Sequence, residues 1–399
     1  MINNIPESNG NIAKQQYCQI VILGCGLSGM LISLSLANLG ISSTILETKI
    51  CDEIYCVDDI RTTALTSESK DFLIQSNLWL LLEDFVSPII DVYVVDNKAP
   101  RMLRFTRDLM NIDALGYMIK NSEFKKILLL AIRNHDLITL IDQCNDYTVS
   151  SQESCNIISF TDSTVINCEL IILCNGINSK LHQRYFTHIV SKSYMQNAIA
   201  FNVSHSLPHE GTAVEHFMPS GPFAILPLTG DYYSSVVWTL PHDYALLIQN
   251  LPVDEFEYII QRNFGDFLGE VKLEGKIGNF PLKAYIAKEY YYNRIVLVGD
   301  SAHLIHPLAG QGLNQSIKDI QTLAGLISTK NIDQRILSKY QELRQSDNML
   351  MYLITDNINC IFSNHSPLLK ALCREALSIA EYTPLIKAAL LRYAMGKRY

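Results

Sequence analysis

Three glycines and one acid near the start of the chain have the types and spacing that bind a dinucleotide. Gly24, Gly26 and Gly29 form a G-x-G-x-x-G turn between a predicted buried strand at 19–23 and a helix predicted to end at residue 38. A second predicted strand ends in Glu47, about 20 residues further on. The glycines permit a tight turn, approach of the backbone to a pyrophosphate and helix–strand packing, while the acid can bind both hydroxyls of an adenosine ribose. We interpret this unit as dinucleotide-binding; the alternative is a coincidental glycine turn.

A second stretch, 294–320, can hold a polar ligand. Its apolar run ends in Gly299-Asp300, and after a compact loop Gly310-Gln311-Gly312 leads into a helix predicted from Leu313 onwards. Backbone N–H groups at a helix start are unpaired, and the helix dipole attracts negative charge there. The stretch therefore predicts a ligand-binding loop.

The chain contains a single G-x-G-x-x-G, which indicates one resident dinucleotide. If the N-terminal unit holds the ADP half of an FAD, no second fingerprint remains for a stably bound nicotinamide nucleotide, so NAD(P)H would bind only transiently. Asp300 could then hold the ribityl hydroxyls. The helix near Gly312 could point its N-terminus at the flavin pyrimidine ring, where negative charge develops on reduction.

Two pairs of histidines could suggest a metal: His303 with His306, and His209 with His216. No Cys, Asp or Glu completes a set at ligand spacing, so we predict no metal site and expect structural hydrogen bonds from His303 and His306. No Ser-His-Asp or Cys-His arrangement is present, and the sequence assigns no general base.

Composition bounds the class of protein. The 399 residues, 48% of them hydrophobic, predict two globular domains, and the net charge of −8 argues against nucleic acid as a partner. The ten cysteines form no Cys-x-x-Cys pair and are interpreted as small buried residues in a reducing compartment.

The first 16 residues are predicted to be a flexible leader without a secretory signal. Because no run of about 18–20 apolar residues occurs, we expect a cytoplasmic protein, at most peripheral at the inner membrane.

Hydrophobic periodicity predicts the remaining elements. We expect a helix at 67–82, two strands within 89–106 around Asp96-Asn97-Lys98, a strand at 115–119, and a helix at 123–133 with Asn121 or Ser122 as its cap. Short strands are predicted at 137–174 and antiparallel strands at 195–285, with a helix near 252–265. Beyond residue 320 we expect helices at 320–327, 333–345, 347–361, 366–379 and 383–395.

The segment GDSAHLIHPLAGQGLNQSIKD resembles the G-D-x-A-H-x-x-x-P-x-x-G-Q-G-x-N stretch of single-component flavoprotein aromatic hydroxylases. Its form from His306 to Asn314, with Asp319 following, is similar to the ubiquinone-biosynthesis hydroxylases that act on polyprenylated phenols. The resemblance covers about residues 18–396. Further matches are Arg61-x-x-Ala64-Leu65, Leu115-Gly116-Tyr117, Pro208 to Ala213, Glu215-His216-Phe217, Gly221-Pro222, Leu226-Pro227-Leu228, Ser235 to Thr239 and Ala394-Met395-Gly396.

The resemblance implies an α/β fold of the p-hydroxybenzoate hydroxylase type. A Rossmann-like FAD-binding domain would comprise residues 17–88, 115–190 and 286–330. An inserted antiparallel β-sheet substrate domain would comprise 89–114 and 191–285, and a C-terminal helical region would comprise 331–399.

The resemblance also implies an activity: NAD(P)H reduces the FAD, O2 adds to give a C4a-hydroperoxide, and OH passes to an electron-rich ring. The substrate would be a polyprenylated phenol or benzoquinol, met at a membrane or in a complex of ubiquinone-biosynthesis proteins. Pro307, Gly310 and Gln311 would line the flavin face and position the substrate. The expected cofactor-binding residues are Gly24, Gly26, Gly29, Glu47, Arg61, Asn121, Asn175, Asp300, Gly310, Gly312, Leu313 and Asn314.

Some positions have a second interpretation or depart from the family. Arg61 could be a solvated surface charge, and Asn121 a helix cap. The family has Asp-Gly where this chain has Asn175-Gly176, and Arg where it has His182, which is mostly neutral at pH 7. Because these positions serve cofactor and NAD(P)H handling in the family, reductant binding is where we expect this chain to differ, with Arg184 or Lys180 as a candidate replacement.

Two other functions stay open from the sequence. The same fold could serve a prenyl-lipid reductase or a hydroxylase of small soluble aromatics, which the His306 to Asn314 motif disfavours. A non-catalytic assembly subunit is disfavoured by the intact glycines, which a scaffold would not need.

Overall fold

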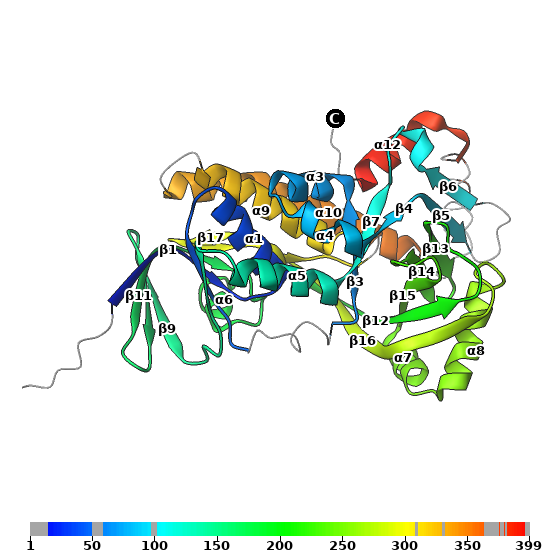
Figure 1. The fold of residues 1–399 in the computed structure, drawn as a ribbon, viewed down its shortest axis with the longest axis horizontal. Coiled ribbons are helices and arrows are strands. Elements are labelled where there is room, and N and C mark those ends of the chain that lie inside the picture. The colour runs from blue at the N-terminus through cyan, green and yellow to red at the C-terminus, as the bar shows by residue number, and fades with distance from the viewer. Residues whose placement is uncertain are drawn as a thin grey trace, which may run out of the picture.

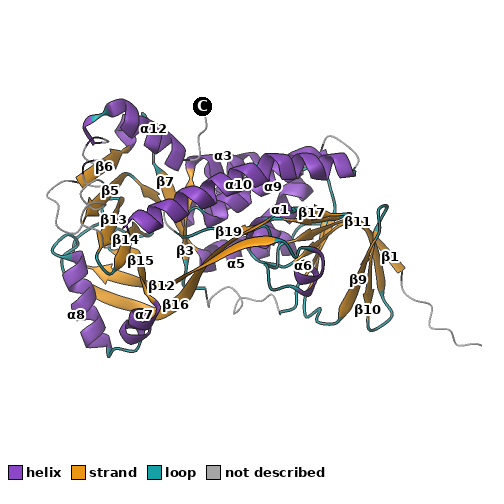
Figure 2. Ribbon diagram, turned by 180° about the vertical axis from the view of Figure 1, so that it is seen from behind, coloured by secondary structure: helices purple, strands orange, loops and turns teal. Residues whose placement is uncertain are grey.

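The computed structural model describes residues 15–49, 59–96, 102–307, 310–328, 332–362, 375, 379 and 381–395 (Figures 1 and 2). Several predictions fall outside these residues: most of the N-terminal leader, the turn after Asp96, most of the helix at 366–379, and Ala309 and Gly396 of the family motifs.

A largely parallel sheet forms the layer that carries the glycine turn. Its strands are β1 (Gln15–Leu23), β2 (Ser43–Leu46), β8 (Ile138–Ile141), β9 (Tyr147–Ser151), β10 (Asn156–Phe160), β11 (Val165–Leu173), β17 (Tyr291–Tyr292) and β18 (Ile295–Leu297). The order is β17-β18-β11-β1-β2-β8, with β9 and β10 attached to β11. β1 pairs in parallel with β2 and β11, and β11 with β18, so their carboxyl ends meet at one edge. Ligands of open α/β sheets bind at such an edge.

A second, mostly antiparallel sheet forms a wall beside it. Its strands are β5 (Asp91–Asp96), β6 (Met102–Thr106), β12 (Ile189–His205), β13 (Thr212–Met218), β14 (Gly221–Pro227), β15 (Tyr233–Pro241), β16 (Val271–Ala287) and β19 (His303–Leu304), in the order β19-β16-β12-β15-β14-β13-β5-β6. The long strands β12 and β16 run from the wall toward the parallel sheet (Figure 2). β19 pairs with β16 although it follows Asp300 in the chain, so the loop after Asp300 is fastened to the wall sheet.

The two faces of the wall carry different side chains because residues along a strand alternate. One face packs against α7 (His242–Gln249) and α8 (Val253–Phe264); this core contains Ile199, Phe201, Phe223, Val236, Trp238, Phe256 and Ile260. We call the other face, which includes Ala200, Glu215, Ala224, Ser235, Val237 and Gly278, the inner face. It turns toward β3 (Thr62–Thr66), because the Thr62 hydroxyl donates to Ser235 Oγ at 3.0 Å.

A small sheet and the helices complete the fold. β3 pairs with β7 (Gly116–Lys120), which pairs with β4 (Val86–Ile89). The remaining helices are α1 (Leu27–Asn38), α3 (Ser67–Gln75), α4 (Trp79–Leu82), α5 (Asn121–Arg133), α6 (Lys180–Tyr185), α9 (Gly312–Ser328), α10 (Gln334–Phe362) and α12 (Pro384–Ala394), with short 3-10 turns η1 (Glu83–Phe85), η2 (Arg107–Leu109) and η3 (Gly299–Ser301). α9 and α10 lie side by side, and α12 lies beside β5 and β6 (Figure 1).

Three expectations about elements are wrong, and one helix was missed. The helix predicted at 67–82 is two helices, because Asn77 adopts a left-handed φ of 53° between α3 and α4. The helices predicted at 333–345 and 347–361 are one helix, α10. α7 was not predicted. Neither Asn121 nor Ser122 caps α5, whose N-cap is Lys120 without a side-chain hydrogen bond. The helix end predicted at residue 38 and the helix predicted near 252–265 agree with α1 and α8 to within a residue or two.

Candidate functional site

The glycine turn between β1 and α1 is shaped for a close ligand. A methyl group on Gly29 would lie 2.0 Å from the carbonyl oxygen of Gly24, so α1 packs directly on the turn. Gly24 has a φ of +108°, and its side-chain position would lie 3.0 Å from Asn175. Gly26 has nothing within 4 Å of its side-chain position. As N-cap of α1 it offers no side chain to the first N–H groups, and the first turn contains no acid. A phosphate is the group that such a helix start attracts.

Glu47 stands beside this turn at the end of β2. Its Oε2 accepts from the Cys25 N–H at 2.7 Å, and its Oε1 accepts from the Thr48 N–H at 2.7 Å. The parallel pairing of β1 and β2 sets this position, because both strands end at the same edge of the sheet. The carboxylate is partly buried and held within reach of the turn.

Gly299-Asp300, some 270 residues away in the chain, comes to the same edge through β18. Gly299 fits between two helix starts: a methyl group there would lie 2.7 Å from Ser28 Oγ on α1 and 2.9 Å from Ser316 Oγ on α9. Asp300 is exposed, yet desolvation by the surrounding protein raises the pKa of its carboxyl, against the attraction of His303 and Arg61. The carboxyl of Asp300 is therefore accessible at the carboxyl edge of the parallel sheet, next to the turn that lies against the starts of α1 and α9.

Arg61 lies between Asp300 and the wall, within electrostatic range of the Asp300 carboxyl. Its guanidinium forms a two-point ion pair with Asp59, with nitrogen–oxygen distances of 2.8 Å, and lies over the ring of Phe280 on the wall. Its side chain is 53% exposed, and Asp59 and Asp300 both raise its pKa. Arg61 is thus solvated and also attracted by Asp300, and its contact with a cofactor stays a prediction.

Asn121 and Asn175 sit on either side of this region. The buried amide oxygen of Asn121 accepts from the Thr63 hydroxyl at 2.7 Å, which ties α5 to β3 next to Arg61. Asn175 is exposed against Gly24, at the end of β11. The neighbouring Gly176 N–H donates to Ser301 Oγ at 2.9 Å. Their contact with a cofactor stays a prediction.

The loop from Pro307 to Asn314 is fastened to β3. Asn314 is fully buried: its Nδ2 donates to Ala64 O at 2.8 Å, and its Oδ1 accepts from the Thr66 N–H at 3.0 Å and from Ser69 Oγ at 2.7 Å. Its amide is thus occupied by the protein, and what it can offer a ligand is its backbone in the first turn of α9. The Gly310 N–H donates to Pro307 O at 2.9 Å, with Gly310 at a φ of +60°.

Gln311, Gly312 and Leu313 follow directly. Gln311 is buried, while Gly312 and Leu313 are partly buried. α9 begins at Gly312, as the sequence predicts, and extends to Ser328. The three residues therefore present the start of this helix at the loop.

A buried charge network supports the loop from behind. Asp319 on α9 accepts from His303 Nε2 at 2.6 Å and from Arg344 Nε at 2.8 Å, and also from the Gly299 N–H at 3.1 Å. Burial alone would raise the pKa of Asp319, but His303 and Arg344 overcome it and lower that pKa to about 2. The structural hydrogen bond expected of His303 is confirmed. Arg344 was missed because no local pattern on α10 distinguishes it from a surface arginine.

Two further histidines are buried. His182 Nε2 is paired with Ser301 O at 2.9 Å, and burial lowers its pKa, so it is neutral. It supports the Asp300 turn and does not face the solvent, whereas Arg184 and Lys180 are exposed. His306 packs edge-on against Tyr194, and burial lowers its pKa to about 4. In the described residues, no group of three or more His, Cys, Asp or Glu side chains lies close enough to hold a metal ion.

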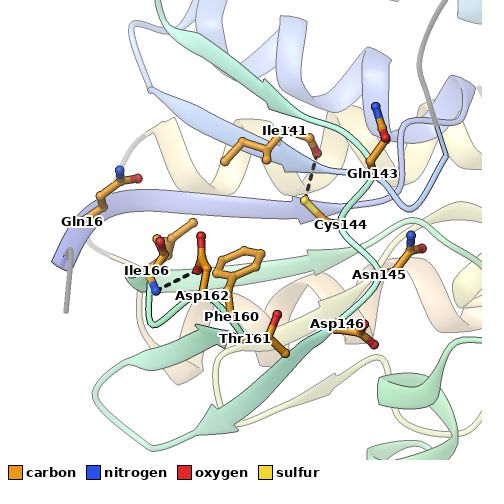
Figure 3. A pocket seen from close by; sticks show the side chains of 11 residues that line it. Gln16, Ile141, Gln143, Cys144, Asn145, Asp146, Phe160, Thr161, Asp162 and Ile166 are labelled. Carbon is orange, nitrogen blue, oxygen red and sulfur yellow. Dashed lines mark hydrogen bonds between the residues drawn. The ribbon is translucent and has the colours of Figure 1, made fainter. Parts of the chain in front are cut away.

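A hollow lies beside the parallel sheet, between the start of β1, the end of β8 and the turn after β10 (Figure 3). Its volume is about 460 Å³, and Gln16, Cys144, Asp146, Phe160 and Asp162 are among the residues lining it. None of the predicted site residues lines it. The N–H of Cys144, which lines the hollow, donates to Glu47 O at 2.8 Å, so the hollow adjoins the end of β2.

The residues present fit an FAD. The open position at Gly26 and the uncapped start of α1 suit a pyrophosphate, and the carboxylate of Glu47 suits a ribose. The accessible carboxylate of Asp300 and the start of α9 lie further along the same edge, where the flavin half would extend.

Comparison with known proteins places the chain in a class. Residues 145–348 match the FAD binding domain family. The structure is similar to p-nitrophenol 4-monooxygenase PnpA from Pseudomonas putida (TM-score 0.77, 14% identity, 97% of this chain and 100% of that one). It is also similar to Klebsiella pneumoniae HpxO complexed with FAD and uric acid (TM-score 0.75, 13% identity, 97% and 98%). The class is thus the FAD-dependent monooxygenases with the p-hydroxybenzoate hydroxylase fold, as predicted.

Two relatives narrow the class. The chain is 30% identical over 400 residues to the ubiquinone hydroxylase UbiL of Rhodospirillum rubrum, covering 98% of this chain and 93% of that protein. It is 27% identical to the 3-demethoxyubiquinol 3-hydroxylase of Escherichia coli, covering 96% and 99%. The chain belongs to the family of FAD-dependent hydroxylases that contains these ubiquinone-biosynthesis enzymes, and FAD is its cofactor.

Proposed function

We propose that this enzyme hydroxylates the aromatic ring of a polyprenylated phenol or benzoquinol intermediate of ubiquinone biosynthesis, using O2 and NAD(P)H. The observation that carries the proposal is the match over nearly the whole length of both chains to the ubiquinone hydroxylase of R. rubrum. When bound, FAD supplies the activation of O2 that this chemistry needs.

The residues of this chain have separate tasks in the proposal. The glycine turn and Glu47 bind the adenosine diphosphate half, and the accessible carboxylate of Asp300 binds the ribityl hydroxyls. Pro307, Gly310 and Gln311 position the substrate against the flavin, with Gly312, Leu313 and Asn314 behind them. The inner face supplies an apolar surface for the prenylated ring, because Ala200, Ala224 and Val237 lie side by side on it. The loop and the wall together exclude water.

The reductant binds only transiently in this proposal. His182 is buried against Ser301 and cannot replace the arginine of the family at an NAD(P)H contact, so the exposed Arg184 or Lys180 takes that part. Exchange of each for alanine should raise the KM for NAD(P)H several-fold and leave FAD content unchanged.

The enzyme meets its substrate at the surface of the inner membrane or in a complex of ubiquinone-biosynthesis proteins. No helix among the described residues is long and apolar enough to cross a bilayer. Sedimentation of purified protein with liposomes that carry the prenylated phenol, and without it, tests this part.

The proposal is tested by the colour and the turnover of the purified protein, which we expect to be yellow with bound FAD. We expect NAD(P)H and O2 consumption to increase when ortho-farnesylphenol, a short polyprenylated phenol, is added, and mass spectrometry to find one added oxygen on its ring. NADH and NADPH are compared in parallel. A yellow protein whose NAD(P)H oxidation ignores prenylated phenols would instead favour a prenyl-lipid reductase or a hydroxylase of small aromatics, and a colourless protein would favour an assembly subunit.

Deletion of the gene identifies the natural substrate. The quinone precursor that accumulates, analysed by mass spectrometry, gives the ring carbon and the prenyl chain length together. Accumulation of no precursor in the deletion strain would contradict the proposal.

A further inference from the structure

Glu215 is a carboxyl group of the inner face that the site described above does not use. Glu215 lies in the middle of β13, opposite Ala224 on β14 and Val94 on β5. The same row continues through Val237 and Ala200. An acid in this position is surrounded by apolar or small side chains on both neighbouring strands, where a hydrophobic residue would be the ordinary choice.

The face on which Glu215 lies is fixed by contacts of its neighbours. Side chains of directly paired residues share a face, so Glu215 points to the same side as Ala224 and Val237. Phe223 and Trp238, one residue away on each strand, pack under α7 and α8. Glu215 therefore points away from these helices.

The inner face looks at the flavin-binding part of the molecule. The Thr62 hydroxyl donates to Ser235, and a methyl group on Gly278 would lie 2.4 Å from the Ile60 side chain. β3 lies between this face and the loop at Gly310, since a methyl group on Gly310 would lie 3.2 Å from Ala64. Glu215 thus belongs to the surface where the proposed substrate would lie.

No charged group in the described residues compensates Glu215. Burial alone raises the pKa of its carboxyl to about 7, and the side chain still keeps some accessible surface. The ionisable groups on the elements packed around it are paired elsewhere: Arg104 with Asp91, Arg61 with Asp59, and Lys387 with Glu381. His216 lies on the opposite side of β13, and Arg392 on α12 is exposed. A desolvated acid with no charged partner among the described residues costs stability and calls for a function.

We propose that Glu215 accepts the proton of the ring hydroxyl of the aromatic substrate during hydroxylation, an inference that rests on the function proposed above. The phenolic O–H bond breaks, the proton passes to the carboxylate, and the electron pair stays on the ring oxygen. The phenolate that results is a more electron-rich ring for attack on the activated oxygen. The proton is released to water after the ring is hydroxylated and the product leaves. A carboxyl that titrates near neutral pH is matched to this task.

The test compares wild type with Glu215→Gln and Glu215→Asp as purified FAD-loaded proteins, with ortho-farnesylphenol as substrate. For wild type, kcat/KM should rise with pH through about 7, because the carboxylate is the active form. Glu215→Gln should lower kcat about 100-fold, with a smaller change in KM, and remove that pH dependence. The difference in kcat between wild type and Glu215→Gln should shrink as the pH approaches about 10, where the phenol ionises by itself. Glu215→Asp should keep the pH dependence at a lower kcat.

Two controls separate a chemical role from a structural one. FAD content and the rate of flavin reduction by NAD(P)H should be unchanged in Glu215→Gln. Glu255→Gln, an acid on α8 that covers the other face of the wall, should behave like wild type. If Glu215→Gln does not retain FAD, Glu215→Asp carries the test alone, and an unchanged kcat in that variant overturns the inference.

The outcomes distinguish this inference from the proposed function. A wild type that hydroxylates no prenylated phenol contradicts the proposed function. A wild type that does, together with a Glu215→Gln variant of equal kcat and equal pH profile, overturns only the role of Glu215.

Discussion

Gly24, Gly26 and Gly29 are glycines for three different reasons. Gly24 adopts a φ of +108°, which L side chains rarely adopt, and Gly29 has no room for a methyl group. Gly26 has neither constraint within the protein, so what remains to explain it is a ligand approaching from outside. Each of the three positions therefore has its own physical reason for a glycine, and the contact of Gly26 with a pyrophosphate stays a prediction.

Gly29→Ala should weaken FAD binding, because α1 must move off the turn to relieve the 2.0 Å contact with Gly24 O. We expect at least a tenfold rise in the Kd for FAD, which corresponds to about 1.4 kcal/mol, measured by fluorescence titration of the deflavinated protein. Gly325→Ala is the matched control, since it lies in α9 with nothing within 4 Å of its side-chain position. Equal affinity of the two variants would contradict the packing argument.

At the scale of elements, α9 and α10 hold the ligand-binding loop through Asp319. The carboxylate joins β19, α9, α10 and the Gly299 turn in one buried network. Because His303 and Arg344 hold its pKa below its ordinary value, the ionised form stabilises the fold above about pH 4, and this contribution is lost as the pH falls toward 2. Periodicity predicted helices here but divided α10 in two, since polar residues such as Gln345 to Asn348 resemble a break, whereas in the fold Arg344 and Asn348 face Asp319.

Arg344→Met should leave Asp319 buried with one partner fewer. We expect a loss of roughly 3–5 kcal/mol in the free energy of unfolding near pH 7, seen as a lower midpoint in urea denaturation. Lys339→Ala on the same helix is the control, because its ion pair with Glu342 is exposed. A loss that is no greater in Arg344→Met than in Lys339→Ala would show that the network contributes nothing to stability.

At the scale of the whole molecule, the C-terminal helix α12 packs between the wall and the small sheet of β3, β7 and β4. Leu391 and Met395 join one core with Met118 of β7, Ala213 of β13 and Leu228, which draws β-strands of both parts together. The outer side of α12 is apolar as well, with Leu385 at 85% exposed. The core stripe and the outer stripe cannot be told apart in the sequence.

Leu391→Ala should remove part of this shared core. Since the side chain is 3% exposed, we expect about 2–5 kcal/mol of destabilisation, read as a lower Tm by calorimetry. Leu390→Ala, with 45% exposure on the same helix, should change the Tm by little. If Leu390→Ala lowered the Tm more than Leu391→Ala, α12 would pack on the wall through a different side of the helix.

The sequence alone determined the ligand class and most strands, because the glycine turn, Glu47 and the 294–320 stretch work through local backbone geometry. A turn, a helix start and a buried strand each need only a few adjacent residues. The tertiary structure decided what lies opposite them. In the fold, His182 is buried against Ser301, and the side-chain amide of Asn314 is hydrogen-bonded to β3. Arg344 pairs with Asp319, and Glu215 lies on the inner face. These outcomes depend on strand register and helix packing between residues far apart in the chain, which no local pattern encodes.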